Sequence, residues 1–194
     1  MSAEDAIVIG METIKNRLRP RTVTFAGVLQ LLFALAFLIA PVAGMIFGAD
    51  IQAAAEAQLT RQGLSPSLLA DKGVRFDESG AAMVVPVSTA VIAALLAWLN
   101  LAGKRAGRIL TFVFQPIFLA LDVFIALSQA SQVQFLQSRL GNGVNAQAII
   151  EASARAYPAW LFTVTDARLI FTLMASILVI ILLLLPSARA YFRK

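Results

Sequence analysis

The sequence predicts an all-α integral membrane protein in which four transmembrane helices form two parallel hairpins, with short helical caps in the two extracytoplasmic loops. Composition is the first reason: 59% of the 194 residues are hydrophobic and only 14% are charged, whereas soluble proteins are about half apolar and about a quarter charged. Charge spacing is the second reason, because several charge-free runs reach the roughly 20 residues that a helix needs to cross a bilayer. In lipid every backbone polar group needs an internal partner, so such runs are expected to be helices.

The charge-free runs locate the four spans. No charged side chain occurs in residues 22–49, 79–103 and 169–188, and residues 109–138 contain one, Asp122. These runs predict spans at about 24–47, 82–102, 109–129 and 168–186. The spans and their loops make up a bundle over residues 23–187.

The distribution of Lys and Arg predicts the orientation. Ten of the 16 lie in the N-terminal segment 1–22, the turn 103–108 and the basic tail 188–194, and six lie in the two long loops and their margins. Cytoplasmic segments of membrane proteins are enriched in these residues. We therefore expect a multi-pass protein of the bacterial plasma (inner) membrane with both termini in the cytoplasm. The pI of about 10.2 then reflects the Lys and Arg residues of the cytoplasmic segments, and no nucleic-acid partner is expected.

The N-terminal segment 1–22 predicts a basic amphipathic helix on the cytoplasmic surface. Its apolar residues recur at steps of four, three and four and so share one face: Ile7, Met11, Ile14 and Leu18. Its basic residues, which we expect at the membrane surface, are Lys15, Arg17, Arg19 and Arg21. Helices of this kind bind anionic lipid, and a docking helix for a cytoplasmic partner is the alternative.

The two long loops predict the caps. The first span has no breaker before Gly63 and the third has none before Gly141, so both helices are expected to continue beyond the membrane and to stop at these glycines. A short helix should follow each stop, the first from Ser65 and the second over residues 146–156, capped by Asn145.

Asp122 is the one ionisable residue well inside a predicted span, and such a charge should face protein or water. It belongs to a polar stripe with steps of four, seven and seven, which consists of Thr111, Gln115, Asp122 and Gln129. Its possible partners are Arg168, Asn100 and Gln30. The carboxylate is expected to act as a strut between helices or as a contact to another subunit, and a proton or cation relay remains a third interpretation.

A strip of small residues marks a second surface, because small residues let membrane helices approach closely. It recurs every four residues on the first span and consists of Ala36, Ala40, Gly44 and Gly48. The strip is expected to pack against the second span or to form an oligomer contact. Residues 177–185 are almost wholly Leu, Ile and Val, so the last span is expected to face lipid.

The sequence offers little chemistry. It contains no Cys and no His, which removes thiolate nucleophiles, Ser–His proteolysis and most transition-metal sites. No P-loop or nucleophile-elbow motif occurs. We therefore expect no enzyme activity, no catalytic residue, no cofactor and no metal.

The four-helix layout, the basic segments 17–21 and 104–108, and the helix stops at Gly63 and Gly141 resemble small actinobacterial accessory membrane subunits, such as the one that accompanies mycobacterial Mce-type lipid importers. The resemblance implies a non-catalytic accessory or assembly subunit of a larger membrane complex, with a lipid transporter as one such complex and other membrane subunits as partners. The alternative is a small oligomeric transporter or channel with Asp122 as its ion or proton site.

Overall fold

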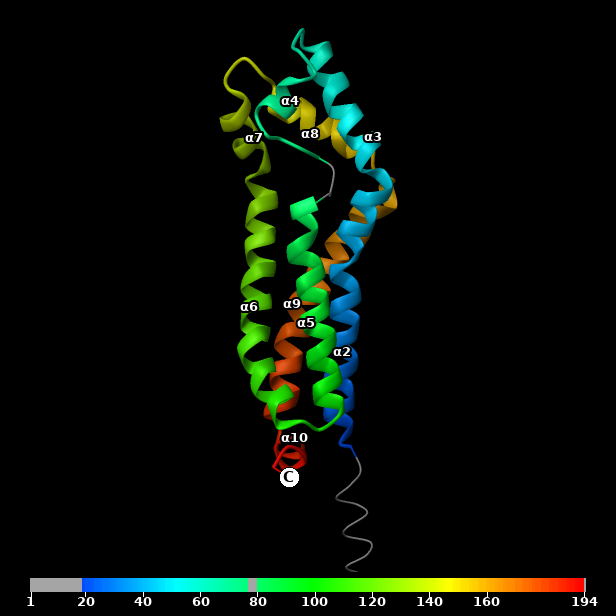
Figure 1. Cartoon of the computed structure of the whole chain (residues 1–194), viewed down its shortest axis with the longest axis vertical. Helices are drawn as coiled ribbons and strands as arrows, with labels where there is room; N and C mark the ends of the chain where they lie inside the picture. The colour runs from blue at the N-terminus through cyan, green and yellow to red at the C-terminus, as the bar shows by residue number, and fades with distance from the viewer. Residues whose placement is uncertain (1–18, 77–79, 194) are drawn as a thin grey trace, which may run out of the picture.

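The computed structural model describes residues 19–76 and 80–193, and the chain within these ranges is helical (Figure 1). The long helices are α2 (Arg21–Phe37), α3 (Ile39–Arg61), α5 (Val84–Leu101), α6 (Arg105–Ala130) and α9 (Ala159–Leu184). The short ones are α4 (Leu68–Asp71), η1 (Gly80–Met83), α7 (Gln132–Leu140), α8 (Ala146–Arg155) and α10 (Pro186–Tyr191). Four segments are long and apolar enough to span a membrane, namely the continuous pair α2–α3, α5, α6 and α9. The chain is a multi-pass membrane protein, as the composition predicts.

The four spans form an up-down-up-down bundle. Helix α2 packs against α5 and α9, and α6 packs against the same two helices. The pairs α2–α5 and α6–α9 are the two expected hairpins, and they run parallel in Figure 1. The short helices α4, α7 and α8 lie at one end of the bundle, here called the cap end, and α10 lies at the other, here called the basic end.

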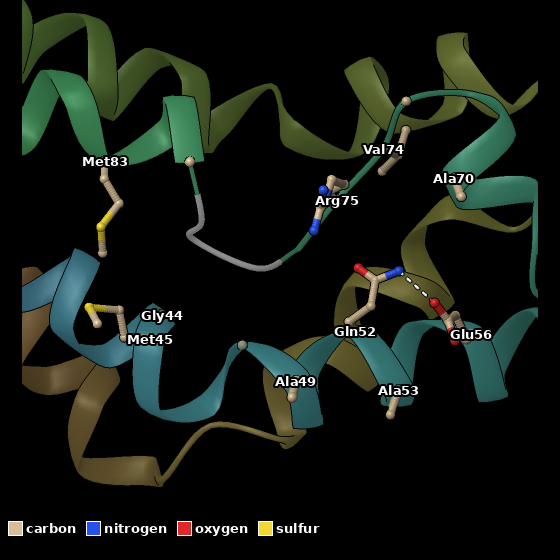
Figure 2. A pocket seen from close by; sticks show the side chains of 13 residues that line it. Gly44, Met45, Ala49, Gln52, Ala53, Glu56, Ala70, Val74, Arg75 and Met83 are labelled. Atoms are coloured by element: carbon tan, nitrogen blue, oxygen red, sulfur yellow. Dashed lines mark hydrogen bonds between the residues drawn. The ribbon is translucent and has the colours of Figure 1, made fainter.

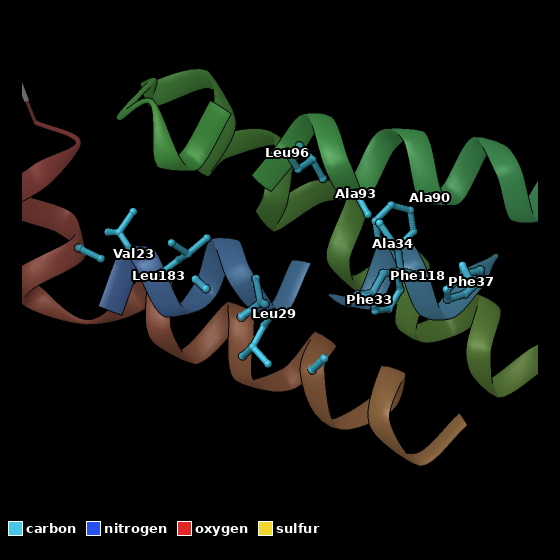
Figure 3. Packing of buried hydrophobic residues seen from close by; sticks show 14 of the residues in the cluster. Val23, Leu29, Phe33, Ala34, Phe37, Ala90, Ala93, Leu96, Phe118 and Leu183 are labelled. Carbon is cyan, nitrogen blue, oxygen red and sulfur yellow. The ribbon is translucent and has the colours of Figure 1, made fainter. Parts of the chain in front are cut away.

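The bundle core is built mainly from α2, with one side chain or more from each neighbour (Figure 3). The rings of Phe33 and Phe118 stack with 5.4 Å between their centroids, and Leu183 is fully buried at the basic end of the same core. At Gly107 the turn of α6 comes so close to α5 that an added Cβ would lie 2.6 Å from Leu99 Cβ. Apolar area thus holds the bundle along its length, and small residues set how closely its helices approach.

The cap has a core of its own, which joins α3, α4, α7 and α8. Its fully buried side chains include Leu59, Leu69 and Ile149. The Asn145 side chain accepts a 3.0 Å hydrogen bond from Ala148 N and so caps α8 as expected. The main chain of Asn145 is held by the Gln62 side chain, which accepts from its N–H at 2.7 Å and donates to its carbonyl at 3.2 Å.

The expected helix extensions are confirmed. Helix α3 reaches Arg61, and the α6–α7 segment reaches Leu140 with a break at Ser131. Gly63 and Gly141 follow these ends with φ of 76° and 91°, a region of backbone conformation that glycine adopts without steric cost. The turn at Leu38, which divides the first span into α2 and α3, was not predicted. Pro41 is its local signal, because a proline has no N–H to donate to the Phe37 carbonyl.

The last span differs from expectation in two ways. Helix α9 begins at Ala159, nine residues before the expected start at 168, because Pro158 is its N-cap residue. Two charged residues, Asp166 and Arg168, therefore lie inside the helix. The expectation that this span faces lipid is wrong for one side. That side is buried against α2 and α6, and its buried residues include Thr172, Ser176 and Val179.

Candidate functional site

Near the basic end, three helices meet at a cluster of buried polar side chains, here called the amide cluster: Gln30 of α2, Asn100 of α5 and Thr111 of α6. Each is at most 1% exposed. Asn100 Nδ2 donates to Gln30 Oε1 at 2.9 Å and to Thr111 Oγ1 at 2.8 Å. Gln30 Nε2 donates to the same hydroxyl at 3.2 Å, and that hydroxyl donates to the Gly107 carbonyl at 2.8 Å. The amide cluster therefore cross-links α2, α5 and α6. Asn100 and Gln30, two of the three possible partners of Asp122, form their hydrogen bonds within this cluster and not with Asp122.

Nearer the cap end, α6 and α9 are joined by polar contacts in two layers. Gln115 Nε2 donates a 3.0 Å hydrogen bond to Ser176 Oγ. Two turns further along α6, Asp122 Oδ1 lies 3.8 Å from Arg168 Nη2. Both charged groups are buried, with 0% of Asp122 and 7% of Arg168 exposed.

The ion pair is completed by an aromatic ring from a third helix. The guanidinium carbon of Arg168 lies 4.5 Å from the centroid of the Phe37 ring, at the end of α2. A cation over an aromatic face is stabilised electrostatically. The Thr172 hydroxyl of α9 also lies within hydrogen-bonding reach of the Asp122 carboxylate, so Arg168 and Thr172 together compensate its charge. The arrangement links α2, α6 and α9 where α2 gives way to α3.

Helix α9 carries a second polar stripe, which was not predicted from the sequence. Arg168, Thr172 and Ser176 recur at steps of four and lie on one helical face, and that face meets Gln115 and Asp122 of the α6 stripe. The signal was present in the sequence, but the strongly apolar run 177–185 obscured it. Gln129, the fourth member of the α6 stripe, lies at the surface of a cleft.

The turn at Leu38 distributes the small-residue strip over different surroundings. Ala36 is buried in α2, before the turn. Ala40 lines a cleft beside α6 and α9, whereas Gly44 and Gly48 line a hollow on another side of α3. The strip therefore forms no single helix-packing face.

The hollow beside Gly44 and Gly48 has a volume of about 940 Å³ and is shown in Figure 2. It lies between α3 and the segment that leads to α5, and Met45 and Met83 lie opposite each other at one end. Gln52 is held in its wall, because its Nε2 donates to Glu56 at 2.8 Å and its Oε1 accepts from Phe76 N at 3.0 Å.

The second opening, here called the partner cleft, lies between α3, α6 and α9 and has a volume of about 870 Å³. Its aromatic side chains are Phe124, Phe135, Tyr157 and Phe162. Its polar side chains are Ser128, Gln129, Ser131, Gln132, Thr165 and Asp166. Phe124 and Phe162 are 65% and 48% exposed, so the cleft opens to the surroundings of the bundle.

The predicted membrane-surface residues are only partly described. Lys15 and Arg17 lie outside the described residues, together with most of the predicted N-terminal helix, whereas Arg19 and Arg21 are exposed at the start of α2. Among the described residues no three metal-ligating side chains come together.

No family model, no curated protein and no solved structure matches the chain. The functional conclusion therefore depends on the two features of this bundle that suit a specific role: the buried ion pair and the partner cleft.

Proposed function

We propose that the protein is a non-catalytic accessory subunit of a larger membrane complex, and that it binds its partner through the partner cleft. The cleft is the observation that carries the proposal. It joins aromatic walls to hydrogen-bonding groups, and Gln129 and Gln132 make no side-chain hydrogen bond within the described chain. Helices that associate in membranes use close packing and hydrogen bonds between polar side chains, which are the two features that this cleft offers.

The position of Asp122 supports a structural role for that residue. A relay for ions or protons requires a carboxylate that water or an ion can reach. Asp122 is fully buried and faces Arg168. The pair holds α9 against α6 one helical turn from residues that line the cleft, such as Ile125 and Thr165, so it fixes the floor of the proposed docking surface.

The partner class follows from the resemblance to accessory subunits of lipid importers. In this proposal the partner is a membrane-spanning subunit of a lipid transporter, both termini of the chain are cytoplasmic, and the partner cleft lies in the outer half of the membrane. Helix α3 and the cap would then contact the partner outside the bilayer.

Co-purification from the source membranes tests the proposal. We expect the tagged chain in a mild detergent to recover a membrane-spanning transporter subunit in a fixed ratio. Ser128→Trp fills the partner cleft from an exposed position and should lower this recovery about tenfold, the effect of about 1.4 kcal/mol of lost binding energy. Ala120→Trp, two turns earlier at an exposed position of α6 outside the cleft, is the matched control and should leave recovery unchanged.

Two outcomes would contradict the proposal. Equal recovery with Ser128→Trp and Ala120→Trp would show that the cleft is not the docking surface. Purification of the chain only with copies of itself, together with an ion-dependent flux that Asp122→Asn abolishes, would establish the transporter alternative.

A further inference from the structure

Four arginines from two distant parts of the sequence meet at the basic end. Arg105 and Arg108 lie in the first turn of α6, and Arg189 and Arg193 lie in and just after α10. The other three guanidinium groups lie close enough to Arg108 to repel its positive charge. The fold brings these two pairs together from distant parts of the sequence, and the four residues are here called the arginine cluster.

The position of α10 is well defined. Pro186 begins the helix, and Ala188 and Phe192 are 0% and 2% exposed against the bundle. The hydroxyl of Tyr191 donates to the Leu101 carbonyl at 3.4 Å, which joins α10 to the end of α5. The short helix at the basic end of Figure 1 is thus a packed element that holds its arginines in place.

Arg108 is also held in a fixed orientation. Its Nε donates to the Leu183 carbonyl at 3.2 Å, and its guanidinium carbon lies 5.4 Å from the centroid of the Phe112 ring. Leu183 belongs to the last turn of α9. The guanidinium therefore lies at the level where the spanning helices end, which is the level of lipid phosphates.

No carboxylate compensates the arginine cluster within the described residues. Asp122 lies inside the bundle, paired with Arg168. The other described acidic residues belong to α3, α4, α8 and the first turns of α9, which lie at or next to the cap end in Figure 1; they are Asp50, Glu56, Asp71, Glu151 and Asp166. Four like charges held together at one site repel each other, and a bound anion would relieve that repulsion.

We propose that the arginine cluster binds the phosphate group of an anionic lipid in the adjacent leaflet. Guanidinium groups bind phosphate oxygens through paired, charge-assisted hydrogen bonds. A lipid places its phosphate at the end of the spanning helices, where Arg108 is fixed, and the bilayer keeps that phosphate at a high local concentration, whereas a free anion is diluted in bulk water. The site is separate from the partner cleft and does not depend on the proposed accessory role.

Lipid titration of the purified full-length chain in neutral detergent tests the site. We expect phosphatidylglycerol to bind and to raise the thermal unfolding temperature, and phosphatidylcholine to do neither at the same concentration. Arg193→Gln should weaken phosphatidylglycerol binding about tenfold, the size expected for one charge-assisted contact. Arg108→Gln should weaken it at least as much, but Arg193 is exposed, so its variant tests the site without loss of the contact to Leu183.

The matched control is Lys104→Gln, which removes one exposed positive charge beside the cluster but no member of it. We expect less than a twofold change in binding for this variant. Equal weakening by Lys104→Gln and Arg193→Gln would overturn the proposal, because binding would then depend on total charge and not on a defined site. Inorganic phosphate that binds as tightly as the lipid would also overturn it, in favour of a site for free anions.

Discussion

Replacing Asp122 with leucine removes the negative partner of a buried cation. The two charged groups are 3.8 Å apart, and unit charges at that distance attract by about 4 kcal/mol at an effective dielectric constant of about 20. Desolvation of both groups offsets much of this attraction in the intact pair. Loss of one partner is nevertheless costly, by about 3–5 kcal/mol, because the other charge remains buried. We expect Asp122→Leu to destabilise the bundle by about 3 kcal/mol, the lower end of that range, since the Phe37 ring still faces Arg168 and a long side chain can move its charge toward the surface.

The two companion variants separate charge from hydrogen bonding. Asp122→Asn keeps a carbonyl oxygen for Arg168 but loses the charge, so it should be less harmful than Asp122→Leu. The double variant Asp122→Leu with Arg168→Met removes both charges and should fall within about 1 kcal/mol of the parent, because apolar replacements of a buried ion pair are often neutral or stabilising.

Reversible unfolding in mixed micelles measures these differences, with Val123→Leu as a control at the neighbouring exposed position. The control should unfold like the parent. The single variant Arg168→Met completes the comparison. If the double variant loses as much stability as Asp122→Leu and Arg168→Met added together, with an interaction below about 0.5 kcal/mol, the two charges contribute independently and the buried pair does not act as a unit.

Three further predictions follow from packing, capping and topology. Gly107→Ala should cost about 1–3 kcal/mol in the same unfolding assay, because its Cβ would meet the backbone of α5, whereas Gly143→Ala should be neutral because nothing lies within 4 Å of an added Cβ. Asn145→Ala should cost about 1 kcal/mol and speed proteolysis of the cap, and an unchanged cleavage rate would mean that Gln62 alone holds that turn. Reporter fusions at Gln62 and Gly107 should lie on opposite sides of the membrane, with Gly107 cytoplasmic, and a shared side would contradict the four-span topology.

Much of the fold was predictable from the sequence for a physical reason. A bilayer satisfies no backbone hydrogen bonds, so a charge-free run of 20 residues has few alternatives to a spanning helix. The helix stops at Gly63 and Gly141 and the cap at Asn145 were equally local, since each depends on the conformation or hydrogen bond of one residue. The stripe that contains Asp122 could be predicted from the spacing of its residues, because residues on one buried face of a helix recur at the helical period.

Only the tertiary structure decided which of these faces meet. Arg168 was one of three possible partners for Asp122, and it is the one that lies beside it, because α9 starts at Ala159 and crosses α6 at that level. The turn at Leu38 has a local signal in Pro41, but only the tertiary structure shows that this turn separates α3 from α6 and opens the partner cleft. The arginine cluster likewise depends on how α10 packs beneath the bundle. Local sequence determined the helices and their ends in this protein. The clefts and charge clusters arose from contacts between residues far apart in the chain, and the pairing of such residues depends on the packing of the whole bundle.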